Sequence, residues 1–217
     1  MHSPQTSPPA VIVNYGMGNV GSIQNMLKRI GKPAVITSDP VVVAAADMLI
    51  LPGVGAFDRG MQQIRSLSLQ DVLHRKVIEE RTPVLGICLG MQLLTRRSEE
   101  GEEPGFGWIE AETVKFRFTE MARGLRIPHM GWNVVEPVRE DAVFSGLHAP
   151  RFYFVHSYHV VCNREEDILG VTTHGYPFAS VIHLDNIWGM QFHPEKSHKF
   201  GMKLLSNFVQ QSSLSPA

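Results

Sequence analysis

Short apolar runs alternate with helical patterns along the first ninety residues of the chain. The apolar runs are continuous, as those of buried parallel strands tend to be, and cover residues 10–14, 33–37, 48–51 and 84–87. Between them, apolar residues recur at helical spacing over residues 20–30, 57–66 and 69–80. This order predicts an α/β fold with a mostly parallel, doubly wound sheet that carries helices on both faces.

The second half of the chain has a different pattern, with short β-leaning segments separated by turn residues. These segments are 113–118, 132–135, 152–155, 160–162, 168–172, 179–183 and 188–192. Their pattern predicts antiparallel strands added to the parallel core. A last helix is expected from about residue 198 to 209, and no repeat or linker interrupts the chain. We therefore predict one domain over residues 10–212, behind a disordered polar tail at residues 1–9.

Composition and charge exclude some classes of function. The chain has 217 residues, a formal net charge of −1 and a sequence pI near 6.8. It therefore lacks the positive electrostatic field that attracts nucleic acid or an anionic membrane. No apolar run approaches the roughly 20 residues that cross a bilayer. Two cysteines, Cys88 and Cys162, give no disulfide framework, which favours a reducing, cytoplasmic location.

The most informative segment is Gly86-Ile-Cys-Leu-Gly90, which follows a buried strand and precedes a helical pattern. A nucleophile at Cys88 would stand on a sharp strand-to-helix turn, where the flanking glycines relieve backbone crowding. The positive end of the following helix favours a thiolate. A buried, inert cysteine is the common alternative, but glycines at this junction favour the nucleophile.

Two further motifs match the needs of a cysteine nucleophile. His193-Pro-Glu195 offers a base and an orienting carboxylate, because side chains two residues apart on an extended segment project to the same side. Leu51-Pro-Gly-Val-Gly55 follows the third predicted strand and can turn a backbone N–H toward a developing oxyanion. Doubly wound sheets place their sites at this carboxyl end of the strands. Each motif is weak alone, and together they predict one catalytic site.

These motifs resemble those of the class I (triad) glutamine amidotransferases, and within that family those of the HisH-type glutaminase subunits of imidazole glycerol phosphate synthase. The resemblance covers residues 11–208, in the family's order. It is carried by Pro52-Gly-Val-Gly-Ala-Phe57, Pro83-Val-Leu-Gly-Ile-Cys-Leu-Gly-Met-Gln-Leu-Leu94, Arg97-Ser-Glu-Glu-Gly101, Pro128-His-Met-Gly-Trp-Asn133, Phe152-Tyr-Phe-Val-His-Ser-Tyr158 and Gln191-Phe-His-Pro-Glu-Lys-Ser197.

The resemblance implies covalent hydrolysis of glutamine, with no cofactor and no metal ion. Cys88 would attack the side-chain amide, and Glu195 would orient His193. His193 would protonate the departing ammonia and activate the water that releases glutamate. The positions that match the family's oxyanion hole are Gly53, Val54 and Leu89. Those that match its glutamine pocket are Gly55, Gln92, Ser157 and Tyr158.

A partner subunit is implied as well. In the family, ammonia crosses to a HisF-type (β/α)₈-barrel synthase, and the heterodimer acts as a lyase that makes imidazole glycerol phosphate and AICAR for histidine biosynthesis. Positions that match the partner-facing side are Asn14, Asn19, Met130, Trp132, Asn133 and Lys196. Core packing is an equal alternative for Met130 and Trp132. Residues 156–162 and 195–201 look closer to a paralogous branch that feeds a sugar amidotransferase for cell-surface polysaccharide, so both acceptors stay open.

Competing interpretations come from other motifs. Gly16-Met-Gly-Asn-Val-Gly21 follows a strand, opens a helix and has Asp39 about 20 residues beyond it, so an NAD-dependent oxidoreductase is an alternative. That interpretation leaves little room for a substrate domain and gives the cysteine, histidine and glutamate motifs no role.

A non-catalytic glutamine-binding scaffold is a second alternative. A metal site on His156 and His159 is disfavoured, because the two face opposite sides of a continuous strand. Cys162 is expected to be a small core hydrophobe.

Overall fold

A mixed sheet forms the centre of the protein in the computed structural model, which describes residues 8–118 and 124–212. Five of its strands run parallel, and four of them come from the first half of the chain, as predicted. In spatial order they are β2 (Ala34–Thr37), β1 (Ala10–Val13), β3 (Leu49–Gly53), β4 (Val84–Cys88) and β12 (Ile187–Met190). The predicted disordered tail lies mostly in residues 1–7, outside the described ranges.

Antiparallel strands extend this core at one edge. They are β11 (Tyr176–Leu184), β10 (Ile168–His174) and β7 (Glu136–Pro137), with β9 (Tyr158–Cys162) joined to β11 and to β5 (Ala111–Lys115). The predicted antiparallel placement of residues 188–192 was only partly right, because β12 pairs antiparallel with β11 but parallel with β4. All four residues of β12 are buried, and a strand covered on both faces belongs in the middle of such a sheet.

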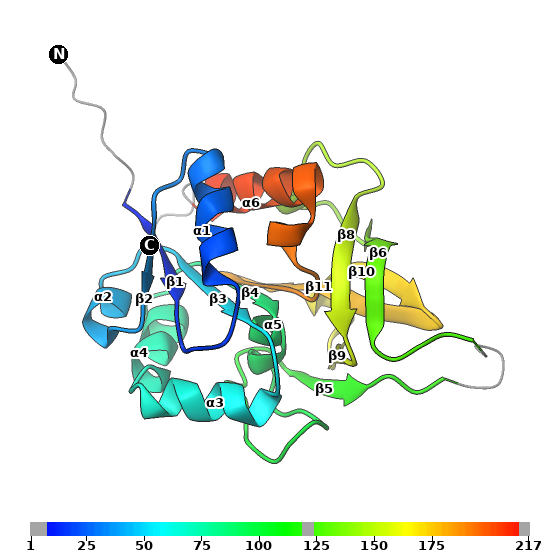
Figure 1. Cartoon of the computed structure of the whole chain (residues 1–217), viewed down its shortest axis with the longest axis horizontal. Helices are drawn as coiled ribbons and strands as arrows, with labels where there is room; N and C mark the ends of the chain where they lie inside the picture. Colours follow the sequence, from blue (N-terminus) through cyan, green and yellow to red (C-terminus); the bar gives the residue numbers. More distant parts are fainter. Residues whose placement is uncertain (1–7, 119–123, 213–217) are drawn as a thin grey trace.

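Two strands stand apart from the main sheet. β6 (His129–Val134) and β8 (Arg151–His156) pair antiparallel with each other in a sheet of their own, which we call the β6–β8 ribbon. Figure 1 shows it beside the main sheet, on the side away from α2. An isolated bridge between Tyr153 and His193 joins it to the segment that follows β12.

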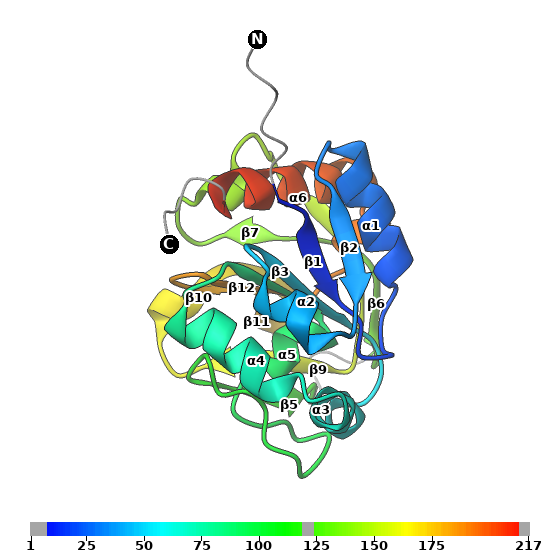
Figure 2. The same ribbon diagram turned by 90° about the vertical axis from the view of Figure 1, so that its left-hand side faces the viewer.

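Helices cover both faces of the sheet, as Figure 2 shows. One face carries α1 (Val20–Arg29) and α6 (His198–Ser212). The other carries α3 (Phe57–Ser66), α5 (Leu89–Leu93) and α4 (Gln70–His74), which continues as a π-helical turn over Arg75–Glu79. Short elements missed by the sequence pattern are α2 (Pro40–Ala44), β7 and the 3-10 turns Ala142–Phe144, Glu165–Asp167 and Pro194–Lys196. No helix within the described ranges is long and apolar enough to cross a membrane.

Successive residues of β1 pack into opposite halves of the core. Val11 and Val13 belong to the cluster under α3, α4 and α5, whereas Ala10 and Ile12 belong to the cluster under α1 and α6. This is why the run is apolar without alternation. The predicted α/β fold with a doubly wound, mostly parallel sheet and added antiparallel strands is therefore confirmed.

The predicted motifs meet at one edge of the sheet. β3 ends at Gly53 and β4 at Cys88, and these two residues are register partners. On the other side of β4, Met190 at the end of β12 pairs with Ile87. The chain that follows β12 therefore carries residues 191–195 to the same carboxyl edge, where the three motifs converge.

Candidate active site

Cys88 occupies a backbone conformation that few residues adopt. Its φ of 53° and ψ of −109° lie outside the regions favoured by L-residues, at a typical cost of about 1–3 kcal/mol. A Cβ on Gly86 would lie 2.7 Å from the carbonyl oxygen of Gly90, and a Cβ on Gly90 would lie 1.7 Å from that of Leu51. The turn is thus possible only with both glycines, as the sequence predicted.

His193 and Glu195 form a buried pair. The Nδ1 atom of His193 lies 2.8 Å from Oε1 of Glu195, and each side chain is 2% exposed. The predicted geometry was only partly right. His193 is extended, but Pro194 and Glu195 begin a 3-10 turn, because proline fixes its own φ in a range that suits the first position of a helical turn. The turn folds the carboxylate back onto the imidazole.

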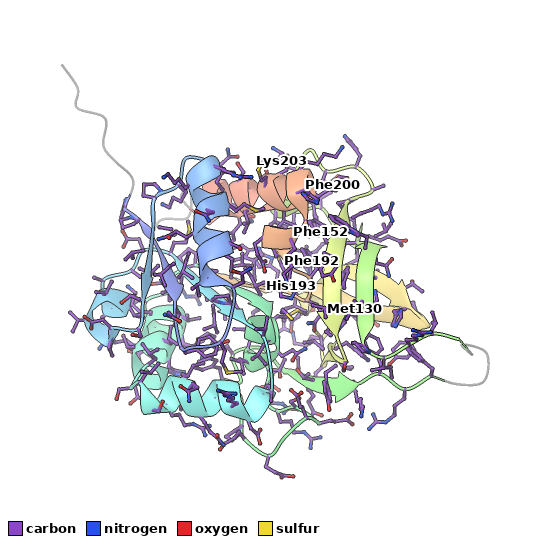
Figure 3. All side chains as sticks on the ribbon, in the orientation of Figure 1. Met130, Phe152, Phe192, His193, Phe200 and Lys203 are labelled. Atoms are coloured by element: carbon purple, nitrogen blue, oxygen red, sulfur yellow. The ribbon has the colours of Figure 1, made fainter. Side chains whose placement is uncertain are left out.

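The β6–β8 ribbon and α6 hold this segment in place. The His193 N–H donates to the Tyr153 carbonyl at 2.9 Å, and the Ser197 hydroxyl donates to the His193 carbonyl at 2.6 Å. A Cβ on Gly201 of α6 would lie 1.8 Å from the carbonyl oxygen of Pro194. Just before the pair, Phe192 stacks on Phe152 of β8, and Figure 3 shows these rings next to His193 in the interior.

The surroundings of His193 favour its charged form. Burial lowers the pKa of His193, but interaction with the Cys88 sulfur and then with the Glu195 carboxylate outweighs burial and raises the pKa to about 9. The buried Nε2 atom of His193 has no hydrogen-bond partner within the described residues. His193 therefore carries a proton at neutral pH, and an imidazolium beside a sulfur stabilises thiolate.

A cavity of about 390 Å³ opens at Cys88. Its walls come from the β3–α3 loop, α5 and the turn between β8 and β9. Six residues predicted for the oxyanion hole and glutamine pocket line it, namely Val54, Gly55, Leu89, Gln92, Ser157 and Tyr158. Glu100, Val155 and His156 line it too, although the sequence interpretation gave none of them a role in this pocket. The structure thus gathers the six predicted positions from three separated stretches of chain around one sulfur, and Glu100 joins them from a fourth.

The predicted oxyanion positions lie on two sides of Cys88. Leu89 begins α5, so its N–H has no acceptor within the helix. Val54 lines the cavity and is 43% exposed, whereas Gly53 is buried and is not part of the cavity wall. A Cβ on Gly53 would lie 2.2 Å from the Tyr15 hydroxyl, which is buried without a hydrogen-bond partner in the described structure.

The exposed strand β6 carries two of the predicted partner-facing residues. Met130 is 61% exposed and Trp132 is 41% exposed, so the core-packing alternative for them was wrong. Trp132 stacks on His198 with ring centroids 5.5 Å apart. Lys196 and Asn19 are exposed as well, whereas Asn14 and Asn133 are half-buried.

Buried histidines link β6 to the cavity. Nδ1 of His156 lies 2.7 Å from the Tyr158 carbonyl, which only accepts, so this nitrogen carries the hydrogen. Nε2 of His156 then accepts from Nδ1 of His129 at 2.9 Å, and the Asn133 amide donates to Nε2 of His129 at 3.1 Å. Each ring is neutral in this arrangement, and each tautomer is set by its neighbour.

His156 and His159 do not face opposite sides, contrary to the prediction. Both rings pack against Phe116, with centroids 5.3 Å and 4.6 Å away. The strand breaks at Ser157, so period-two alternation does not carry across it. Within residues 8–118 and 124–212, no cluster of three or more His, Cys, Asp or Glu side chains is placed to hold a metal ion.

These histidines should make the fold acid-sensitive. Burial and then the nearby His174 lower the pKa of His129 to about 4, and the pKa of His156 is also lowered by burial. The unfolded chain therefore binds more protons below about pH 6.5, so stability is lost as pH falls from there toward 4. We expect His129 alone to cost about 2 kcal/mol at pH 5, measured by urea unfolding at pH 7.5 and pH 5.

A matched pair of variants tests this origin. His129→Asn should reduce the acid-dependent loss, whereas His148→Asn, at an exposed position, should leave it unchanged. Equal unfolding free energies at the two pH values in the unmodified protein would contradict the assignment.

The glycine-rich loop at residues 16–21 lacks the contacts of a dinucleotide site. In that fingerprint the third glycine permits close packing of helix on strand, but a Cβ on Gly21 would meet nothing within 4 Å. Asp39, the expected ribose ligand, instead accepts from the Val41 N–H at 2.8 Å and caps α2. Gly18 faces Pro52 and Gly53, so the loop supports the cavity edge.

Comparisons with known proteins agree with this geometry. The family model described as Glutamine amidotransferase class-I matches residues 6–212. Imidazole glycerol phosphate synthase subunit HisH 2 of Methanococcus maripaludis is 52% identical over 93% of this chain and 98% of its own. HisH 2 of Pseudomonas aeruginosa is 50% identical to this chain, and HisH 1 of M. maripaludis is 43% identical. Each of these two matches covers 92% of this chain and 98% of the relative. A solved glutamine amidotransferase has the same fold, with a TM-score of 0.71, 21% identity and coverage of 94% and 99%.

Proposed function

Because this chain belongs to the class I glutamine amidotransferases, we propose that it is the glutaminase subunit of an imidazole glycerol phosphate synthase, the name that its relatives carry. The observation that carries the proposal is the charged His193–Glu195 pair beside Cys88 on its strained turn. A cysteine held beside a protonated histidine, which a buried carboxylate orients, can attack a carboxamide and protonate its leaving group.

In the proposed reaction the Cys88 sulfur bonds to the side-chain carbonyl carbon of glutamine. His193 gives its proton to the amide nitrogen, the C–N bond breaks, and ammonia leaves behind a thioester on Cys88. His193 then takes a proton from water as the water oxygen bonds to the thioester carbon. The C–S bond breaks, glutamate is released and the sulfur regains its starting state. Throughout, Glu195 keeps Nδ1 of the imidazole directed at its own carboxylate.

The cavity supplies the other contacts that glutamine needs. The N–H groups of Val54 and Leu89, with Gly53 behind them, would stabilise the tetrahedral oxyanion. The proposed substrate contacts are Gly55, Gln92, Ser157 and Tyr158. Glutamine also carries an α-ammonium group, and Glu100 is the acidic residue on the cavity wall. We therefore add Glu100 as the residue that binds this charge.

We propose that the exposed face of the β6–β8 ribbon binds a HisF-type (β/α)₈-barrel synthase as a heterodimer. Exposed tryptophan and methionine are typical of interface cores, and Met130 and Trp132 stand together on β6. The other proposed contacts are Asn14, Asn19, Asn133 and Lys196. Ammonia released at Cys88 would pass to the barrel without loss to water. A cytoplasmic location stays a prediction from the sequence.

One observation favours a second candidate for the ammonia acceptor. Methanococcus maripaludis has two such subunits, and this chain is 52% identical to HisH 2 but 43% identical to HisH 1. A duplicated subunit is free to serve a second synthase. The same glutaminase chemistry would then feed a sugar amidotransferase of cell-surface polysaccharide biosynthesis. The residues around Cys88 serve both candidates equally.

Reconstitution with the two candidate partners tests the proposal. The purified chain alone is expected to hydrolyse glutamine slowly. Adding its HisF-type barrel together with the barrel's acceptor substrate should raise glutamine turnover about 10–100-fold, a typical size for coupling between two sites. Stimulation by the sugar amidotransferase instead would assign the chain to the second candidate. Fast turnover alone that neither partner changes would contradict a coupled subunit.

A further inference from the structure

Gln191 is a fully buried amide that the reaction described above does not use. It lies two residues before His193, and its backbone N–H donates to the Ser180 carbonyl at 3.0 Å. Its side-chain nitrogen Nε2 lies 3.8 Å from the Cys88 sulfur, within hydrogen-bonding distance for sulfur. Its side-chain oxygen Oε1 lies 3.2 Å from Nε2 of Gln92.

The surroundings fix which end of the Gln191 amide faces the sulfur. The Tyr158 carbonyl can only accept, and it lies 3.3 Å from the Gln92 side-chain amide, so Nε2 of Gln92 must point toward it. The same Nε2 group has its second hydrogen left for Oε1 of Gln191. The remaining end of Gln191, an N–H donor, therefore faces Cys88. A reversed Gln92 amide would place its oxygen against the Tyr158 carbonyl oxygen, and a reversed Gln191 amide would place its NH₂ group against the NH₂ group of Gln92.

The Tyr158 carbonyl is itself held in place. It also accepts from Nδ1 of His156 at 2.7 Å, and His156 accepts from His129 on β6. The orientation of Gln191 thus rests on a connected set of hydrogen bonds, in which His156 and Gln92 both donate to the Tyr158 carbonyl, Gln92 also donates to Gln191, and Gln191 donates to the Cys88 sulfur. A donor whose direction is set by buried neighbours needs no reorganisation when charge forms on the sulfur.

We infer that Gln191 is a positioning residue that donates a hydrogen bond to the Cys88 thiolate and, with His193, fixes the sulfur for attack. The two groups approach the sulfur from different residues of the same segment, one as a neutral donor and one as an ion. Gln191 would hold the sulfur toward the cavity while His193 transfers its proton. This inference rests on the proposed function, because it assigns a role in the same glutaminase site.

Alkylation of Cys88 by iodoacetamide across the pH range tests the inference directly. Gln191→Met keeps the length of the side chain and removes the donor. The alkylation profile, which is the rate of Cys88 alkylation plotted against pH, should have its midpoint about one pH unit higher in this variant. The kcat for glutamine should fall about tenfold at neutral pH, as expected for loss of a hydrogen bond to a charged group. KM should change less than kcat. Gln92→Met, which frees the Gln191 amide to rotate, should shift the profile in the same direction by less.

A matched control separates this role from a structural one. Thr172→Val removes a buried hydroxyl on β10 that bonds the Val134 carbonyl and Ser180, and should lower the melting temperature without moving the alkylation profile. If Gln191→Met does not fold, Gln191→Asn, which draws the amide back by one methylene, should give the same upward shift. A profile that coincides with that of the unmodified protein in the folded variant would overturn the inference. Because alkylation needs no glutamine, this result stays distinct from failure of the glutaminase activity itself.

Discussion

Replacing Cys88 with alanine is expected to abolish glutamine hydrolysis, with a fall of at least about 10⁴-fold, because Cys88 is the only cysteine among the described residues that line the cavity and the only side chain there placed beside the His193–Glu195 pair. The alanine side chain fits the space of the cysteine, so the fold should persist. In complex with the proposed synthase, the variant should still support the reaction from added ammonium. The measurement is glutamate release from glutamine, alongside product formation from ammonium, on one preparation of the complex.

The second cysteine of the chain is the natural control. Burial and then the nearby Asp167 raise the pKa of the Cys162 thiol to about 12, so this sulfur stays protonated and inert at neutral pH. Cys162→Ala should therefore keep glutaminase activity within about twofold of the unmodified protein. Hydrolysis that survives in Cys88→Ala, or disappears in Cys162→Ala, would show that the nucleophile has been misassigned.

Glu195→Gln should reduce kcat/KM for glutamine by about 10²–10⁴-fold, the usual worth of an oriented acid–base group. The carboxylate is one of the groups that hold the pKa of His193 at about 9 against the opposing effect of burial. Without the negative charge, the pKa of His193 should fall, and the imidazole should lose its proton at a lower pH. The basic limb of the pH–rate profile should therefore move to lower pH. Steady-state rates between pH 6 and pH 10 measure both effects.

Glu112→Gln makes the same chemical change at a surface ion pair. Glu112 accepts from Arg97 at 2.8 Å outside the cavity, and such pairs contribute little. Activity and pH profile should stay unchanged in this variant. A Glu195→Gln enzyme with full activity would show that His193 needs no carboxylate, and a third member of the triad would have to be sought elsewhere.

Much of the fold could be predicted because local pattern and tertiary position agree in its first half. Ala10 to Val13 is buried on both faces, so its uninterrupted apolar run indicated a central strand correctly. The direction of the strand around Trp188 was misjudged, because an apolar run of four residues does not show whether its neighbouring strands run parallel or antiparallel to it. Direction depends on where the chain enters the sheet, and here β12 enters beside β4 after the long antiparallel excursion.

The site was predictable where glycine, cysteine and proline impose their own backbone geometry. Gly86 and Gly90 lie in a turn that has no room for a side chain, so their spacing around Cys88 indicated the tertiary structure of the turn. No such local constraint identified Gln191 or Glu100 as residues of the site. A glutamine in a strand-like segment has the same local pattern whether it faces solvent or a sulfur, and only the packed structure decides which.

The histidines show the same limit in another form. His156 and His159 looked like alternate residues of one strand, but Ser157 interrupts the ladder and the turn brings both rings onto Phe116. The alternation of residues along a strand does not reveal a one-residue break such as that at Ser157. The hydrogen bond between His129 and His156, which are 27 residues apart in the sequence, depends in addition on the pairing of β6 with β8.

The β6–β8 ribbon has a thermodynamic consequence for an assembly of two subunits. It exposes Met130 and Trp132 on one strand, while the other strand supplies Val155 to the cavity wall and the Tyr153 carbonyl that holds His193. A subunit docked on β6 and a glutamine molecule in the cavity therefore both contact the β6–β8 ribbon. If docking tightens glutamine binding by some factor, glutamine must tighten docking by that same factor. Under that condition the proposed heterodimer is bound most tightly while glutamine occupies the cavity, and falling glutamine levels favour its dissociation.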